Sequence, residues 1–200
     1  MATDLEMASK LNRKFAYIFD LDGVIIDSMI NYYLSIRAVI LERFGVDPDR
    51  DFYLSMSGMS ISGQLDGVFE RYGISGDKDE LIEAINEHYL NIIHTGEPIS
   101  CNIQLLKLLI KNGTPVAVAS GSSGQVIDIC MKNFDIKGVS AIVPIEEVKH
   151  GKPNPEAFLL AAKKLGFPPR DCVVVEDSDA GAQAAMAAGM RLLHFNDTRQ

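Results

Sequence analysis

Two aspartates, separated by a single residue, end an apolar segment near the start of the chain. Residues 15–24 read Phe-Ala-Tyr-Ile-Phe-Asp-Leu-Asp-Gly-Val, and such an apolar run is typical of a strand buried on both faces of a parallel sheet. Ligands of open α/β sheets bind beyond the carboxyl ends of the strands, where we therefore expect Asp20 and Asp22. Crowded carboxylates repel each other unless a cation is close, and oxygen ligands suit Mg²⁺. The pattern predicts phosphoryl chemistry at a magnesium site; the alternative is a strand that ends in an ordinary turn at Gly23.

A second apolar segment is followed by a loop rich in serine and glycine. Residues 116–119 read Val-Ala-Val-Ala, the loop covers residues 120–124, and a helix is predicted over 125–134. A helix that begins directly after such a loop points backbone N–H groups and the positive end of its dipole toward a bound anion. We therefore expect Ser120 and the backbone at Gly121 to contact a phosphate. An ordinary solvated loop is the alternative.

A lysine lies in a loop just before another predicted helix. In the segment Gly-Lys-Pro-Asn-Pro-Glu, Asn154 suits the N-cap, Pro155 the first helical position and Glu156 the positive end of the dipole. The two prolines restrain Lys152, whose ammonium group can neutralise a phosphate and nearby carboxylates. A single loop lysine is usually just solvated, and Lys152 is distinguished by the motifs that accompany it.

A third apolar segment also ends in acids. It leads into Glu176 and Asp177, and an alanine-rich helix follows. These two carboxylates reach the same edge of the predicted sheet as the first pair. We expect Asp177, together with Glu176, to complete an oxygen shell for Mg²⁺ with the Asp20 carboxylate and the backbone carbonyl of Asp22.

The four motifs, in this order and at predicted strand ends, resemble those of the haloacid dehalogenase superfamily, and most closely its phosphatase and phosphomutase branch. They are Asp20-Leu21-Asp22-Gly23-Val24, Ser120, Lys152-Pro153-Asn154-Pro155 and Glu176-Asp177. The resemblance implies that Asp20 is a nucleophile that carries the phosphoryl group as an aspartyl-phosphate, and that Asp22 is the general acid–base. A dehalogenase would need neither the metal nor the second aspartate, so Asp22 favours phosphate chemistry.

The α/β pattern is interrupted by a helical segment. It breaks after Ser28 and resumes near Cys101, with helices predicted over 29–44, 60–72 and 79–93. We predict a Rossmann-like, doubly wound parallel sheet formed by residues 13–28 and 98–200, an inserted α-helical cap domain at 29–97, and a flexible extension at 1–12. The resemblance implies that such a cap closes over the site and selects the substrate.

The segment around the start of the second of these helices resembles the cap loop that faces the active site in related enzymes. Its polar residues Ser57, Ser60 and Gln64 could bond the hydroxyl groups of a sugar or polyol phosphate. Ile61 stands where β-phosphoglucomutase-like members of the family carry an arginine that binds a second phosphate, so the sequence favours a phosphatase over a mutase. We expect a phosphatase acting on a small phosphorylated metabolite. A β-phosphoglucomutase-type phosphomutase and a non-catalytic phosphometabolite-binding regulator are the alternatives.

Composition indicates an ordinary soluble enzyme. The chain has 200 residues and a net charge of −8, which disfavours nucleic-acid binding because a phosphate backbone needs clustered lysine and arginine. We see no membrane span and no signal-peptide pattern, so we expect a cytoplasmic protein that does not bind membranes, as a monomer or weak homo-oligomer. The three cysteines, Cys101, Cys130 and Cys172, are expected to be reduced core residues.

Overall fold

The computed structural model describes residues 15–56, 59 and 61–195. They form two compact units, one from residues 15–25 and 99–195, the other from residues 26–98. The second unit, residues 26–98, begins earlier and ends later in the sequence than the predicted insertion of residues 29–97. The reason is a small antiparallel pair, β2 (Ile26–Asp27) and β3 (Glu97–Pro98), which joins the two ends of the unit. The predicted extension at 1–12 lies outside the described residues.

The first unit, which we call the core unit, is built on a five-stranded parallel sheet in the order β5-β4-β1-β6-β7. Apolar residues dominate β1, β4 and β6, as expected for strands covered on both faces. The register sets Phe19, the last residue of β1, opposite Val118 and Val175. The residues that follow β1, β4 and β6 therefore emerge at one edge. The strands are β1 (Ala16–Phe19), β4 (Val116–Ala119), β5 (Ala141–Val143), β6 (Cys172–Glu176) and β7 (Arg191–His194).

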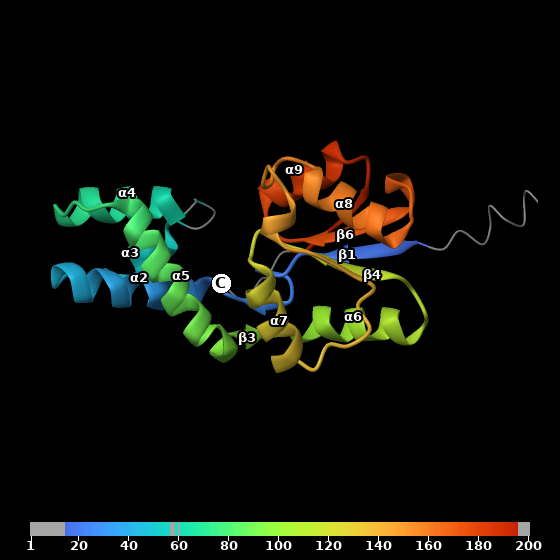
Figure 1. The fold of residues 1–200 in the computed structure, drawn as a ribbon, viewed down its shortest axis with the longest axis horizontal. Helices are drawn as coiled ribbons and strands as arrows, with labels where there is room; N and C mark the ends of the chain where they lie inside the picture. Colours follow the sequence, from blue (N-terminus) through green and yellow to red (C-terminus); the bar gives the residue numbers. More distant parts are fainter. Residues whose placement is uncertain (1–14, 57–58, 60, 196–200) are drawn as a thin grey trace, which may run out of the picture. The chain divides into compact units, whose positions relative to one another are not determined.

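Helices cover both faces of this sheet. Figure 1 shows α8 and α9 on one face and α6 and α7 on the other, so the predicted doubly wound, Rossmann-like fold is confirmed. Small side chains on α8 and α9 pack around Phe158 against the strands, which lets these helices approach closely. The helices are α6 (Ser100–Lys111), α7 (Gly124–Asn133), α8 (Glu156–Leu165) and α9 (Asp179–Ala187), with 3-10 turns at Ile145–Glu147 and Pro169–Asp171.

Residues 26–98, which we call the helical unit, contain the three predicted helices. They are α2 (Met29–Phe44), α4 (Ile61–Tyr72) and α5 (Lys78–Ile92), followed by a 3-10 turn at Ile93–Thr95. Helix α2 ends at Gly45, which adopts a left-handed conformation with φ +67°. A fourth helix, α3 (Arg50–Leu54), was not predicted, because five residues are too few to show a helical period. Its N-cap is Asp49, which accepts the Phe52 N–H.

Two smaller expectations need correction. Helix α8 begins at Glu156 rather than Pro155, although Asn154 does accept the Glu156 N–H at 3.0 Å as a capping residue would. Cys101 is exposed, because the buried face of α6 is formed by its neighbours, whereas Cys130 and Cys172 are buried as predicted. In the described part of the chain, no helix is long and apolar enough to cross a membrane.

Helix α2 offers a test of the packing of the helical unit. Ile40 is fully buried in its apolar cluster, and the next residue, Leu41, is 42% exposed. We expect Ile40→Ala to lower the free energy of unfolding by about 2–5 kcal/mol, because it leaves a cavity. The matched control Leu41→Ala should change it by less than about 0.5 kcal/mol. Urea unfolding followed by circular dichroism measures both, and equal losses would contradict this packing.

Candidate active site

Asp20 is the first residue after β1, and the end of this strand fixes its position. Its backbone N–H donates to the carbonyl of Val175 on the neighbouring strand β6, and its carboxyl group is buried. The next residue of β6 is Glu176, which is also fully buried. The parallel register therefore brings two acidic side chains side by side at the edge of the sheet.

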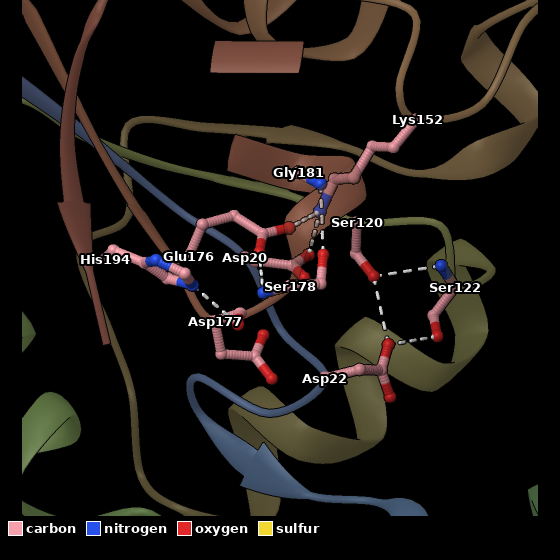
Figure 2. A network of polar contacts seen from close by, with 10 residues as sticks. All are labelled: Asp20, Asp22, Ser120, Ser122, Lys152, Glu176, Asp177, Ser178, Gly181 and His194. Carbon is pink, nitrogen blue, oxygen red and sulfur yellow. Dashed lines mark hydrogen bonds and ion pairs between the residues drawn. The ribbon is translucent and has the colours of Figure 1, made fainter. Parts of the chain in front are cut away.

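Lys152 lies between these two carboxylates. Its Nζ is 2.8 Å from Asp20 Oδ1 and 2.6 Å from Glu176 Oε1 (Figure 2). The ring of Phe158 lies 5.1 Å from the same nitrogen. The structure therefore brings Lys152 together with the acids at this edge of the sheet.

The loop that carries Lys152 is held by Glu156, the first residue of α8. The Glu156 carboxylate accepts the backbone N–H groups of Lys149 and His150 at 3.1 and 3.0 Å. These bonds hold the pKa of Glu156 below its usual range. The sequence indicated only a favourable helix dipole for Glu156, since nothing in the residue types shows that the loop folds back onto it.

The electrostatics of the site are dominated by burial. Burial raises the pKa of Asp20 to about 8, against the opposing effect of Lys152, while the charges of Glu176 and Asp22 raise it further. Burial alone would lower the pKa of Lys152, but the two carboxylates beside it outweigh this and raise that pKa above its ordinary value. Lys152 thus stays charged, and one ammonium group does not offset the acids around it.

Both oxygens of Glu176 have partners. Oε1 contacts Lys152, and Oε2 accepts the backbone N–H of Ser178. Ser178 is also the N-cap of α9, because its hydroxyl accepts the Gly181 N–H at 3.0 Å. A Cβ atom at Gly181 would overlap the Glu176 carboxylate, so the first turn of α9 needs a glycine here. Glu176 is therefore arranged to hold Lys152.

Asp177 is held from two sides. Its backbone carbonyl accepts a hydrogen bond from His194 Nε2 at 2.8 Å, and its carboxylate lies against Gly23. Gly23 has φ +74°, and a Cβ atom there would overlap the Asp177 carboxylate. Burial, with the charge of Glu176, raises the pKa of Asp177 to about 6. The glycine after Asp22 thus makes room for the acid after β6.

Asp22 is contacted by two hydroxyl groups from the loop after β4. Ser120 Oγ donates to Asp22 Oδ2 at 3.2 Å, and Ser122 Oγ donates to the same oxygen at 2.7 Å (Figure 2). The Ser122 N–H donates to Ser120 Oγ at 2.9 Å. Gly121 lies between the two serines and is exposed. The sequence analysis did not predict the contact of Ser122 with Asp22, because a Ser-Gly-Ser-Ser-Gly sequence does not indicate which hydroxyl faces Asp22.

Three carboxylates are close enough to share a cation. Asp20, Glu176 and Asp177 each offer an oxygen, and these oxygens lie within 4.8 Å of one another. Asp20 Oδ1 is buried, and Lys152 Nζ is its ion-pair partner. Lys152 also contacts Asp20 and Glu176, and all three carboxylates are candidates to hold a metal. An all-oxygen donor set suits a hard divalent cation.

Comparison with known proteins agrees with this geometry. The sequence profile of the haloacid dehalogenase-like hydrolases matches residues 17–195. The chain belongs to this family. It is 32% identical to the β-phosphoglucomutase of Bacillus subtilis over 182 residues, which is 88% of this chain and 80% of that protein. It is 29% identical to the fructose-1-phosphate phosphatase of Escherichia coli over 181 residues, which is 86% of this chain and 92% of the relative.

Solved structures of haloacid dehalogenase-like hydrolases share the fold. A putative β-phosphoglucomutase from Thermotoga maritima superposes with a TM-score of 0.72 at 26% identity, over 92% of this chain and 88% of that one. The resemblance found from the four motifs is therefore confirmed, together with the fold class and the membership among hydrolases that include phosphatases.

The predicted specificity residues lie in the helical unit. Ser57 and Ser60 are outside the described residues. Gln64 is buried, and its side-chain oxygen accepts the Tyr53 hydroxyl at 3.0 Å, which is a packing role within the unit. Ile61 packs against the apolar cluster of the same unit. Substrate selection by these four residues stays a prediction.

Gly181 gives a test of how tightly the acids are packed. Alanine in a helix normally stabilises it by about 1 kcal/mol relative to glycine. We expect Gly181→Ala to do the opposite and lower the free energy of unfolding by about 1–3 kcal/mol, because the new methyl group would displace Glu176.

The control is Gly124→Ala at the first residue of α7. There the nearest atoms to an added Cβ are those of Pro144, at 3.7 Å, which is ordinary contact. This variant should be as stable as the parent chain or slightly more so. Thermal unfolding of the two variants measures the difference. A stabilising Gly181→Ala would refute the packing described for Glu176.

Proposed function

We propose that this protein is a Mg²⁺-dependent phosphatase that hydrolyses a small phosphorylated metabolite, a sugar or polyol phosphate, through a phosphoryl group held on Asp20. The observation that carries the proposal is the meeting of Asp20 and Asp22 with Lys152 at one edge of the sheet. A nucleophile, a proton carrier and a cation thereby adjoin a serine hydroxyl and backbone N–H groups suited to phosphate.

The first step transfers the phosphoryl group to Asp20. A carboxylate oxygen of Asp20 bonds to phosphorus while the bond from phosphorus to the substrate's ester oxygen breaks. Asp22, in its protonated form, gives its proton to that leaving oxygen, which departs as an alcohol. Lys152, Ser120 and the loop at Gly121 offset the charge of the transferring group.

The second step returns Asp20 to its starting state. A water molecule attacks the phosphorus of the aspartyl-phosphate and gives a proton to Asp22, now a carboxylate. The bond between phosphorus and the Asp20 oxygen breaks, and inorganic phosphate leaves. The sum is one phosphate ester and one water converted to one alcohol and one phosphate.

The residues present fit a magnesium ion. Asp20 and Asp177 would hold it with their carboxylates, the backbone carbonyl of Asp22 would add a ligand, and Glu176 would support the site while holding Lys152. A bound Mg²⁺ would neutralise charge on the phosphoryl group and on the carboxylates around it. The close approach of carboxylate oxygens from Asp20, Glu176 and Asp177 supports this assignment.

The substrate class rests on the relatives and on Ile61. Relatives include the fructose-1-phosphate phosphatase and, at 31% identity over 187 residues, hexitol phosphatase A of Escherichia coli. Ile61 packs in the apolar cluster of the helical unit and supplies no cation for a second phosphate, which favours hydrolysis over the mutase reaction. The cytoplasmic location and the oligomeric state stay predictions from the sequence.

The test is phosphate release from a panel of sugar phosphates, polyol phosphates, glycolate phosphate and nucleotides, with Mg²⁺ or with a chelator. We expect release that requires the metal. Asp20→Asn should lower kcat by at least about 10³-fold, since it removes the nucleophile. The control is Asp179→Asn, which changes an exposed acid on α9 in the same way.

Other outcomes would each identify a different function. Conversion of glucose 1-phosphate to glucose 6-phosphate without phosphate release would indicate the mutase alternative. Substrate binding with no turnover in either condition would indicate a phosphometabolite-binding regulator. Full activity in Asp20→Asn would exclude the aspartyl-phosphate route.

A further inference from the structure

We propose that Ser122 is a positioning residue for Asp22, and that its hydroxyl holds the Asp22 carboxyl group in the orientation needed to exchange a proton with the leaving oxygen. The proposal rests on the proposed function, because it gives Asp22 its role as acid and base. Ser122 belongs to none of the four motifs.

The geometry makes Ser122 the closer of the two hydroxyl groups. Its Oγ lies 2.7 Å from Asp22 Oδ2, whereas Ser120 Oγ lies 3.2 Å from the same atom (Figure 2). Ser122 is buried, with 6% of its surface exposed. A buried, short hydrogen bond between a hydroxyl and a carboxyl oxygen is among the stronger neutral-to-charged contacts in proteins.

The two serines have different duties during turnover. Ser120 is the hydroxyl proposed to contact the phosphoryl group, and a hydroxyl has a single hydrogen to donate. When Ser120 donates to phosphate, its longer contact with Asp22 is given up. The hydroxyl of Ser122 is then the one of the two that still holds Asp22.

The contact restrains the orientation of the Asp22 carboxyl group. Ser122 Oγ lies 2.7 Å from Asp22 Oδ2, so the carboxyl group is held at one of its oxygens from the loop after β4. A restrained carboxyl group is oriented for proton transfer to the leaving oxygen, which is a gain in the chemical step rather than in binding.

The experiment compares two substrates that differ in their need for a proton. An alkyl phosphate from the panel releases an alkoxide that must be protonated, whereas p-nitrophenyl phosphate releases a stable phenolate. The ratio kcat/KM reports steps up to formation of the aspartyl-phosphate, so it isolates departure of the leaving group. We expect Ser122→Ala to lower kcat/KM for the alkyl phosphate by about 10-fold or more, and that for p-nitrophenyl phosphate by less than about 2-fold.

Two further variants accompany it. Ser122→Thr keeps the hydroxyl and should retain the alkyl phosphate activity within about 3-fold. Ser123→Ala makes the same change at the next residue, whose hydroxyl caps α7 through the Val126 N–H and is not among the two that contact Asp22. It should affect stability alone and lower both activities equally or not at all.

Each result decides the role of Ser122. Equal losses with both substrates would show that Ser122 supports only the fold of the loop, and no loss with either would show that it does not act on Asp22; both overturn the proposal. If wild-type protein hydrolysed neither substrate, the proposed function itself would fail. If wild type hydrolysed both and the variants showed no difference between them, only the role of Ser122 would fail.

Discussion

The balance of charge at the carboxyl edge of the sheet is the constraint on which the rest of the site depends. Three carboxylates, those of Asp20, Glu176 and Asp177, lie within reach of one another. The ammonium group of Lys152 forms ion pairs with Asp20 and Glu176. Burial makes each of these charges costly, and unpaired buried charges cost most. Three negative groups and one positive group leave an excess of two, which one divalent cation would offset. Burial, together with the charges of neighbouring carboxylates, raises the pKa of Asp20 and Asp177.

Much of the surrounding chain serves to bring these groups so close together. Gly23 and Gly181 leave room for carboxylates where any larger residue would collide with them. Glu156 holds the loop that delivers Lys152, and the first turn of α9 supplies the N–H that fixes Glu176. The five parallel strands fix the positions from which these side chains emerge. The site is therefore assembled from backbone geometry and buried charge, with little freedom left in its side chains.

The sequence predicted those features that follow from periodicity and strand order. Buried parallel strands are apolar runs, and their carboxyl ends meet, so the convergence of Asp20, Ser120 and Asp177 at one edge could be foreseen. Features that depend on the local path of the backbone could not be predicted from the sequence. Ser122 looks like its neighbours in sequence, and its contact with Asp22 follows only from the turn after β4. Glu176 was expected to bind metal, which stays a prediction, and the sequence did not show that its oxygens also contact Lys152 and Ser178. Elements of two to five residues, such as β2, β3 and α3, carry no period to detect.

Calorimetric titration of Mg²⁺ into the protein, without substrate, tests the central claim most directly. The account predicts saturable binding of about one ion per chain, because one divalent cation offsets the excess charge of this group. Asp177→Asn should weaken that binding by at least about 10-fold, while Asp179→Asn, which changes an exposed acid two residues away, should leave it unchanged. Absence of binding in the wild-type protein, or equal binding by the two variants, would contradict the account.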